Sequence, residues 1–214
     1  MAKFLKTSGR AGLRGFLDGA ARGLLRIGLT ANAMTFIGTA VIVAASVWLI
    51  PSGHLVAATI VITCAAFTDL FDGAMARLSG KTSRFGALLD STMDRVADGA
   101  VLAGIAFYLL RNDMALAGAF ALWCLIASEV VSYVKARSES LGTECPVGIV
   151  ERPERLIGVG LVTIAAVAGV PYAWEVGLGL LGVLSTVTVA QRLIHSHKAM
   201  SEDEAEDSAD ARQN

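Results

Sequence analysis

Long apolar runs, separated by short polar connections, fill most of the chain after residue 28. Runs of about 20 apolar residues are long enough to cross the hydrocarbon core of a bilayer as helices. Period-2 alternation is absent, and a segment in lipid must pair its own backbone groups, so an all-α integral membrane protein is expected. The pattern predicts six transmembrane helices, over residues 31–50, 54–76, 85–110, 113–138, 153–170 and 172–195.

The segment before the first span has a different pattern. Between Gly12 and Ile27, apolar residues recur at helical spacing and arginines interrupt the run. The apolar stripe consists of Leu13, Phe16, Leu17, Ala20, Leu24 and Ile27. This predicts an amphipathic helix on an anionic membrane surface, with a solvated linker helix as the alternative. The expected organisation is an interfacial segment over residues 1–28, a membrane domain over 29–198 and a disordered acidic tail over 199–214.

Composition agrees with a membrane protein. The chain has 214 residues, of which 54% are hydrophobic and 17% are charged. Soluble globular domains carry about 25% charged residues, so the composition argues against an ordinary soluble domain. No cleavable signal peptide is expected, because the basic N-terminus leads into a stretch interrupted by glycine and arginine. The three cysteines, Cys64, Cys124 and Cys145, suggest neither a metal site nor a disulfide framework.

Basic residues predict the orientation of the chain. The short connections at residues 51–53, 111–113 and 169–171 contain a single basic residue, Arg111. The other lysines and arginines lie on the opposite side, in the terminal segments, in the longer connections or in the parts of the spans next to them. By the positive-inside rule, both termini and the longer connections are expected to face the cytoplasm.

Four aspartates stand at the cytoplasmic ends of the second and third spans. They form the pattern Asp69-x2-Asp72-Gly73-x2-Ala76-Arg77-x8-Gly86-x3-Asp90-x3-Asp94. One Asp at the centre of a spanning helix costs about 2.5–3.5 kcal/mol, and four together repel one another unless a cation lies between them. At about 100° per residue, each group of residues shares one helix face, and the connection between the helices is short enough for a hairpin. The sequence therefore predicts a site for Mg²⁺ or Mn²⁺, with two ions expected.

Other interpretations of the acidic residues were weighed. As helix-end salt bridges, the aspartates would pair with Arg77, Arg84 and Arg95. Asp98 continues the i+4 series by one turn, and it is expected to support the site or the fold rather than bind metal.

A second group of residues is basic. Ser128, Ser132 and Lys135 share one face of the fourth span. Arg155 follows Pro153 at the start of the fifth span, and Arg192 lies at the end of the sixth. If the three cations converge, they form an anion pocket beside the metal site. The alternative is that each one binds lipid headgroups at the cytoplasmic surface.

The motifs of this chain resemble those of a known family. The pattern from Asp69 to Asp94 is similar to the complete signature of the CDP-alcohol phosphotransferases. Leu29-Thr30-Ala31-Asn32, with Thr35, resembles the start of the first span in these enzymes, with Ala31 in place of the usual proline. The resemblance implies six helical spans, a homodimer, and a reaction that joins CDP-diacylglycerol to an alcohol and releases CMP.

Shorter motifs resemble one branch of the family. Val134-Lys135-Ala136-Arg137, Glu151-Arg152-Pro153-Glu154-Arg155 and Gln191-Arg192 are similar to those of the bacterial phosphatidylinositol-phosphate synthases. The implied acceptor is inositol phosphate, and the implied location is the bacterial inner membrane. A phosphorylated acceptor also needs a cationic site, whereas a neutral alcohol does not.

The resemblance also implies a role for each matching residue. Asp69, Asp72 and Asp90 would hold the metals, and Asp94 would act as general base, as a ligand, or as both. The residues that would contact the CDP moiety are Asn32, Asp69, Asp72, Gly73, Ala76, Arg77 and Thr82. Those that would bind the acceptor phosphate are Ser132, Lys135, Arg155 and Arg192.

Three alternatives to this function stay open from the sequence. Glycerol 3-phosphate could be the acceptor instead, which would give phosphatidylglycerol phosphate. An ion or proton transporter would spread its acids through the depth of the membrane, whereas here they cluster at one end. A purely structural membrane protein would show no metal dependence.

Overall fold

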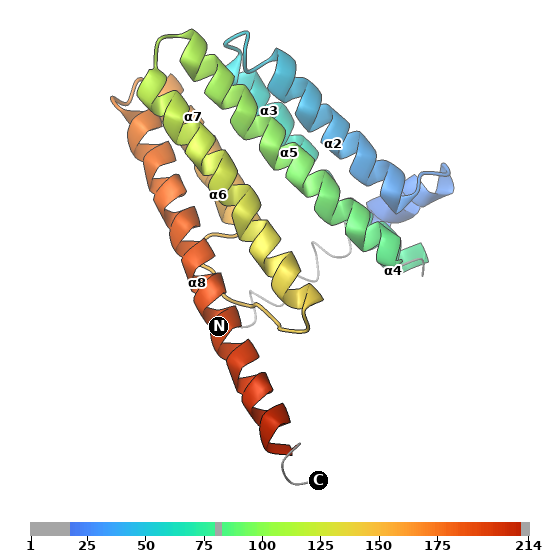
Figure 1. The fold of residues 1–214 in the computed structure, drawn as a ribbon. Helices are drawn as coiled ribbons and strands as arrows, with labels where there is room; N and C mark the ends of the chain where they lie inside the picture. Colours follow the sequence, from blue (N-terminus) through green and yellow to red (C-terminus); the bar gives the residue numbers. More distant parts are fainter. Residues whose placement is uncertain (1–17, 80–82, 211–214) are drawn as a thin grey trace, which may run out of the picture. The chain divides into compact units, whose positions relative to one another are not determined.

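The computed structural model describes residues 18–79 and 83–210, with the backbone alone for residues 69, 70, 72, 79 and 203–210. Every regular element in this part of the chain is a helix (Figure 1), which confirms the all-α prediction at this level. Residues 18–26 are helical. The helices that follow are α2 (Ala31–Trp48), α3 (Leu55–Ala66), α4 (Thr68–Ser79), α5 (Arg84–Arg111), α6 (Ala115–Ser140), α7 (Arg152–Val167) and α8 (Ala173–Asp210).

Three of the described helices are long and apolar enough to cross a membrane. They are α2, α6 and the Ala173–Glu202 part of α8. A shorter apolar helix, α3, follows α2. Although α5 has 28 residues, Asp90, Asp94 and Asp98 interrupt its apolar sequence. The protein is thus a helical membrane protein, and the number of six spans stays a prediction.

The second predicted span, 54–76, is not one continuous helix. The helix α3 ends at Ala66 and α4 begins at Thr68. The Thr68 hydroxyl donates a hydrogen bond to the carbonyl oxygen of Ala65 at 2.6 Å, so a side chain competes with the backbone for this acceptor. A Cβ atom at Gly38 of α2 would collide with the same hydroxyl, so α2 passes close to the break. The segment that carries the first two aspartates is therefore a separate helix.

The chain divides into two compact units, Met1–Val101 and Leu102–Asn214, with the boundary inside α5. In the first unit, α2 packs against α3 and α4. The helical segment 18–26 joins this unit through a small core of Ala21, Ala74 and Met75, each 0% exposed. Leu24 packs against that core as the predicted stripe requires, whereas Ile27 is 74% exposed. The interfacial position of this segment stays a prediction.

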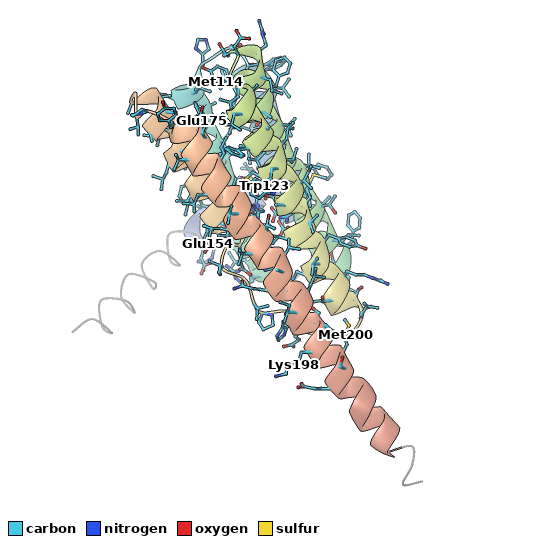
Figure 2. The ribbon with its side chains drawn as sticks, turned by 60° about the vertical axis from the view of Figure 1, so that its left-hand side comes forward. Met114, Trp123, Glu154, Glu175, Lys198 and Met200 are labelled. Atoms are coloured by element: carbon cyan, nitrogen blue, oxygen red, sulfur yellow. The ribbon has the colours of Figure 1, made fainter. Side chains whose placement is uncertain are left out.

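The second unit contains α6, α7, α8 and the end of α5. The helices α6 and α8 run in the same direction, and α7, which lies between them in the sequence, runs in the opposite direction (Figure 1). Figure 2 labels Met114 and Glu175 at the end where α6 and α8 begin. α8 packs extensively against α6 and also against α7. Gly182 permits the close approach to α6, because a Cβ atom there would lie 3.0 Å from the Trp123 ring. This packing brings the end of α6, the start of α7 and the second half of α8 together.

The acidic end of the chain differs from its prediction. Residues 199–210 were expected to be disordered, whereas α8 continues to Asp210. Alanine and glutamate, of which this segment has three each, have high helix propensity. An i,i+4 pair also links Lys198 Nζ to Glu202 Oε1 at 3.8 Å, but the lysine precedes the glutamate, which is the less favourable order, so the pair adds little to the helix.

Candidate functional site

The residues at the start of α2 form a helix cap. Thr30 is the N-cap residue, and its hydroxyl accepts a hydrogen bond from the backbone N–H of Ala33 at 3.2 Å. Ala31 then occupies the first helical position, where proline is well tolerated and where the family pattern has one. The cap places Asn32 in the first turn of α2, so the substitution of Ala31 for proline leaves the position of Asn32 intact.

The start of α5 lies against Asn32. The backbone N–H of Gly86 donates a hydrogen bond to the Ser83 hydroxyl at 2.9 Å, which closes the first turn of the helix. A Cβ atom at Gly86 would lie 3.4 Å from Asn32 Oδ1. Asp90 and Asp94 follow Gly86 at intervals of four residues and share its helix face. One predicted CDP-binding residue and two predicted metal ligands are therefore arranged along one side of α5.

On α4, the predicted site residues that the structure describes in full are Gly73, Ala76 and Arg77. Arg77 Nη1 lies 3.6 Å from the position that a Cβ atom of Gly73 would take, so the guanidinium group folds back over the glycine. The side chains of Asp69 and Asp72 lie outside the described part of the structure, and so does the whole of Thr82. The meeting of the two acidic faces stays a prediction.

Arg95 lies between Asp94 and Asp98. Its Nη2 atom is 3.9 Å from Asp94 Oδ2 and 3.8 Å from Asp98 Oδ2. The Asp98 side chain is 2% exposed, whereas that of Asp94 is 22% exposed. A buried carboxylate beside a cation fits the supporting role expected of Asp98. These contacts also agree in part with the alternative in which the aspartates serve as helix-end salt bridges, since Arg95 approaches both Asp94 and Asp98.

Only two of the four predicted metal ligands, Asp90 and Asp94, have described side chains, so the structure tests the metal site in part. Within residues 18–79 and 83–210, no group of three or more His, Cys, Asp or Glu side chains could hold a metal ion. Of the four predicted ligands, that search covers Asp90 and Asp94. These two carboxylates, one turn apart and on the face that begins beside the Asn32 amide oxygen, have the oxygen chemistry that Mg²⁺ and Mn²⁺ prefer. The described donors fit a hard divalent cation.

In the second unit, Arg192 is a buried cation held from three directions. Its side chain is 3% exposed. Nε donates to the carbonyl oxygen of Val147 at 2.8 Å, and Nη1 donates to that of Val131 at 2.8 Å. Nη2 donates to Glu151 Oε1 at 2.9 Å. The guanidinium group therefore joins α8 to α6, to the loop after α6 and to the residue that precedes α7.

Lys135 reaches the same carboxylate from α6. Its Nζ atom lies 3.8 Å from Glu151 Oε1, the oxygen that accepts the hydrogen bond from Arg192. The side chains of Lys135 and Glu151 are 40% and 48% exposed, so this part of the cluster is open to solvent. The structure thus brings Lys135 and Arg192 together, with Glu151 between them.

The two other predicted acceptor residues flank this cluster. Ser132 is one turn before Lys135 on α6 and is half-buried, and its hydroxyl donates to the Ser128 carbonyl oxygen at 3.1 Å. Arg155 is 3% exposed in the first turn of α7, and its backbone N–H donates to the Glu151 carbonyl oxygen at 3.2 Å. Both lie within a turn of a cluster residue along their own helices.

Glu151 is the member of this cluster that the sequence analysis missed. Glu151 stands in one of the short motifs, but no role was predicted for its side chain. The available signal was local: the backbone N–H of Glu151 donates to Glu154 Oε2 at 3.1 Å, which forms part of a capping box at the start of α7. Its contacts with Lys135 and Arg192 depend on the packing of three helices, which spacing alone does not reveal.

Hydrogen bonds hold the loop before Glu151, and the end of α6 that leads into it, against α8. The backbone N–H of Val150 donates to Thr188 Oγ1 at 3.2 Å, and the Ser138 and Ser196 hydroxyls are hydrogen-bonded at 2.7 Å. Gly148 has a φ of 147° and faces Thr188 and Arg192 so closely that a Cβ atom would lie 2.9 Å from Thr188 Cγ2. These contacts hold Glu151 at a defined place relative to Arg192.

The chain is similar to proteins of one enzyme family. The family model described as CDP-alcohol phosphatidyltransferase matches residues 28–190. The phosphatidylinositol phosphate synthase of Mycobacterium tuberculosis (strain ATCC 25618 / H37Rv) is 45% identical over 182 residues, which cover 81% of this chain and 82% of that protein. The protein of the same name from Corynebacterium glutamicum is 40% identical over 198 residues, with 89% and 88% covered.

Solved structures give the same result. A crystal structure of the M. tuberculosis phosphatidylinositol phosphate synthase with CDP-DAG bound matches with a TM-score of 0.79 at 42% identity, and it covers 84% of this chain and 92% of that one. A structure of that enzyme in complex with manganese and citrate matches with a TM-score of 0.77 at 41% identity. The match covers 84% of this chain and 88% of that chain.

Proposed function

The chain belongs to the CDP-alcohol phosphatidyltransferase family, and we propose that it transfers the phosphatidyl group of CDP-diacylglycerol to a hydroxyl group of inositol phosphate. The products are phosphatidylinositol phosphate and CMP. The similarity extends over more than four fifths of the chain and of the phosphatidylinositol phosphate synthases that it matches. The observation that carries the choice of acceptor is the cluster at Glu151, where two cations converge on a single anionic oxygen.

The first unit is proposed to bind the nucleotide end of CDP-diacylglycerol. Gly73 and Ala76 are small, so the pyrophosphate can approach the backbone of α4 closely. Arg77, which folds over Gly73, is positioned to pair with a phosphate oxygen. The full proposed set is Asn32, Asp69, Asp72, Gly73, Ala76, Arg77 and Thr82.

The four aspartates of the signature are proposed to hold the divalent metal. Asp69 and Asp72 on α4, with Asp90 and Asp94 on α5, would bind Mg²⁺ or Mn²⁺, and two ions are expected. Bound there, the metal supplies positive charge that offsets the pyrophosphate and the departing CMP. Asp98, paired with Arg95, supports the Asp94 turn of α5 without binding metal.

Asp94 is the proposed general base. Its carboxylate would accept the proton of the acceptor hydroxyl as that oxygen forms a bond with the β-phosphorus of CDP-diacylglycerol. The bond between that phosphorus and the bridging oxygen breaks at the same time, and CMP leaves with the electron pair. The proximity of Arg95 keeps this carboxylate oriented on its helix face.

The second unit is proposed to select the acceptor. Lys135, Arg155 and Arg192 would neutralise the phosphate of inositol phosphate, and Ser132 would add a hydroxyl donor. Arg192 is suited to this role because two backbone carbonyl groups fix its plane in advance. A neutral alcohol has no charge to offset these cations, so it would bind weakly.

We also propose a location and an assembly. The protein would lie in the bacterial inner membrane as a homodimer, with the active site and both termini in the cytoplasm. A protease added to intact spheroplasts should leave a C-terminal tag uncut, and cleavage there would reverse the orientation. Light scattering in detergent should give about twice the chain mass of 22.3 kDa.

The test of the function is an acceptor assay with purified full-length protein. CDP-diacylglycerol, Mg²⁺ or Mn²⁺, and one acceptor at a time are supplied, and CMP release is measured. We expect release with inositol phosphate and little with glycerol 3-phosphate or free inositol. A chelator should abolish release, and added metal should restore it. Release with glycerol 3-phosphate alone would favour phosphatidylglycerol-phosphate synthesis, and release that persists in chelator would exclude the proposed metal role.

A further inference from the structure

One carboxylate oxygen occupies the place where an anion would meet the two cations. Glu151 Oε1 lies 2.9 Å from Arg192 Nη2 and 3.8 Å from Lys135 Nζ. A phosphate oxygen bound by the same two groups would take the same position, since carboxylate and phosphate oxygens accept from cations with similar geometry. In this structure, the chain therefore supplies its own anion to the acceptor cluster.

Arg192 does not depend on Glu151 for its position. Two backbone carbonyl groups, those of Val131 and Val147, hold Nε and Nη1 at 2.8 Å each. If the Glu151 carboxylate moved away, the guanidinium plane would stay fixed and Nη2 would be free to donate to another anion. The arginine is thus an anchored donor, and its exchangeable partner is Glu151.

Glu151 itself can move without unfolding its helix. Its side chain is 48% exposed. Its backbone is held separately, by a hydrogen bond from its N–H to Glu154 and by one from the Arg155 N–H to its carbonyl oxygen. Rotation of the side chain toward solvent would break the contacts with Lys135 and Arg192, and also the capping bond that this side chain accepts from the backbone N–H of Glu154. The two bonds made by the Glu151 backbone would stay intact.

We infer that Glu151 is a specificity-determining residue that competes with the acceptor phosphate for Lys135 and Arg192. This inference rests on the proposed function, because it takes these residues as the acceptor site. An acceptor must replace the carboxylate, and a phosphate dianion can do so because it brings more charge and more acceptor oxygens. Neutral alcohols and weak anions cannot replace it, so the cluster stays closed to them.

The test is Glu151→Gln in the full-length protein, with Glu144→Gln as the matched control. Both changes remove one negative charge from the segment between α6 and α7, and Glu144 is an exposed residue whose contact with α8 runs through its backbone carbonyl oxygen. The KM for inositol phosphate is measured at saturating CDP-diacylglycerol. Inorganic phosphate serves as a competitive inhibitor in the same assay. A thermal unfolding midpoint checks that each variant is folded.

We expect the KM for inositol phosphate and the inhibition constant of inorganic phosphate to fall about three- to tenfold in Glu151→Gln, as for removal of a half-exposed competing charge. The value of kcat should not fall, and Glu144→Gln should behave like wild type. The difference should shrink at high salt. A KM that rises in a folded Glu151→Gln variant would overturn the inference, because it would show that Glu151 positions the cations for the acceptor. An unchanged KM would overturn it as well.

Failure of the proposed function gives a different result. If the cluster is not the acceptor site, Lys135→Met will leave the KM for inositol phosphate unchanged in a protein that still releases CMP. If the cluster is the acceptor site but Glu151 does not compete, Lys135→Met will raise that KM and Glu151→Gln will not lower it.

Discussion

A single buried guanidinium group determines the geometry at one end of the second unit. Arg192 satisfies carbonyl oxygens on α6 and on the following loop, and it also binds Glu151. A lysine keeps the charge but has one compact ammonium group, so it cannot donate in these three directions at once. Arg192 therefore holds this end of the unit together, and in the proposed function it also binds the acceptor phosphate.

Arg192→Lys should lower both stability and acceptor binding. We expect a loss of about 3 kcal/mol of unfolding free energy, since carbonyl groups and a carboxylate are left without their donor. Arg137→Lys is the matched control, because Arg137 is exposed and its guanidinium group donates to Ser140 of its own helix, and a change within about 0.5 kcal/mol is expected. Thermal unfolding in detergent measures the first effect, and the KM for inositol phosphate measures the second. Equal stabilities of the two variants would refute the anchoring role.

Asp94→Asn tests the proposed base. The amide keeps the size of the side chain but cannot accept the proton of the acceptor hydroxyl, so CMP release should fall by about 10²–10⁴-fold. Metal binding should be largely retained, because the three other aspartates remain; manganese binding followed by electron paramagnetic resonance measures this. Unchanged CMP release would remove Asp94 as the base, whereas loss of manganese binding would make it chiefly a ligand.

At the scale of residues, spacing predicted some contacts and missed others. The series Gly86, Asp90 and Asp94 follows from helix geometry, and the structure places all three on α5 as expected. Glu151 was missed because its partners, Lys135 and Arg192, are distant in the sequence. They lie on helices that only packing brings together. Periodicity reports the faces of a helix, but it carries no information about which faces meet.

At the scale of elements, close glycine contacts control how α8 packs. A Cβ atom at Gly177 would collide with the Val162 side chain of α7, and one at Gly182 would lie 3.0 Å from Trp123 of α6. Dense packing leaves little room for such atoms, because a branched side chain cannot move away without disturbing its own neighbours. These glycines therefore permit the helix approach on which the cluster at Glu151 depends.

Gly177→Ala should destabilise the second unit. We expect a cost of about 1–3 kcal/mol, as for an overpacked core position. Gly23→Ala is the control, because a Cβ atom there meets nothing within 4 Å and alanine favours the helix by up to about 1 kcal/mol. Thermal unfolding of both variants measures the difference. If Gly177→Ala were as stable as Gly23→Ala, α7 and α8 would not pack as described.

The helices themselves were largely predictable, and their breaks were not. Apolar runs predicted the extents of α2, α5, α6 and α7 to within a few residues. The run from 54 to 76 contains no Asp, Glu, Lys or Arg before Asp69, so hydropathy alone could not show that α3 and α4 are separate. That break depends on the Thr68 hydroxyl and on the proximity of Gly38 of α2. Likewise, acidic composition suggested disorder after residue 199, whereas helix propensity continues α8 to Asp210.

At the scale of the whole molecule, the two units carry different chemistry. The first contains the aspartate signature and Asn32, and the second contains the cation cluster around Glu151. Large apolar side chains such as Val176, Leu180 and Ile194 are exposed along α8, as expected for a helix surrounded by lipid or by another helix. The proposed function therefore assigns nucleotide-lipid binding to the first unit and acceptor selection to the second.

The most direct measurement is the identity of the lipid product. Purified protein is incubated with CDP-diacylglycerol, divalent metal, and an equimolar mixture of inositol phosphate and glycerol 3-phosphate, and the lipids are identified by mass spectrometry. The proposed function predicts phosphatidylinositol phosphate as the main product, with its yield reduced in Lys135→Met. Phosphatidylglycerol phosphate as the main product, or no phosphatidyl transfer to either acceptor by folded protein, would contradict it.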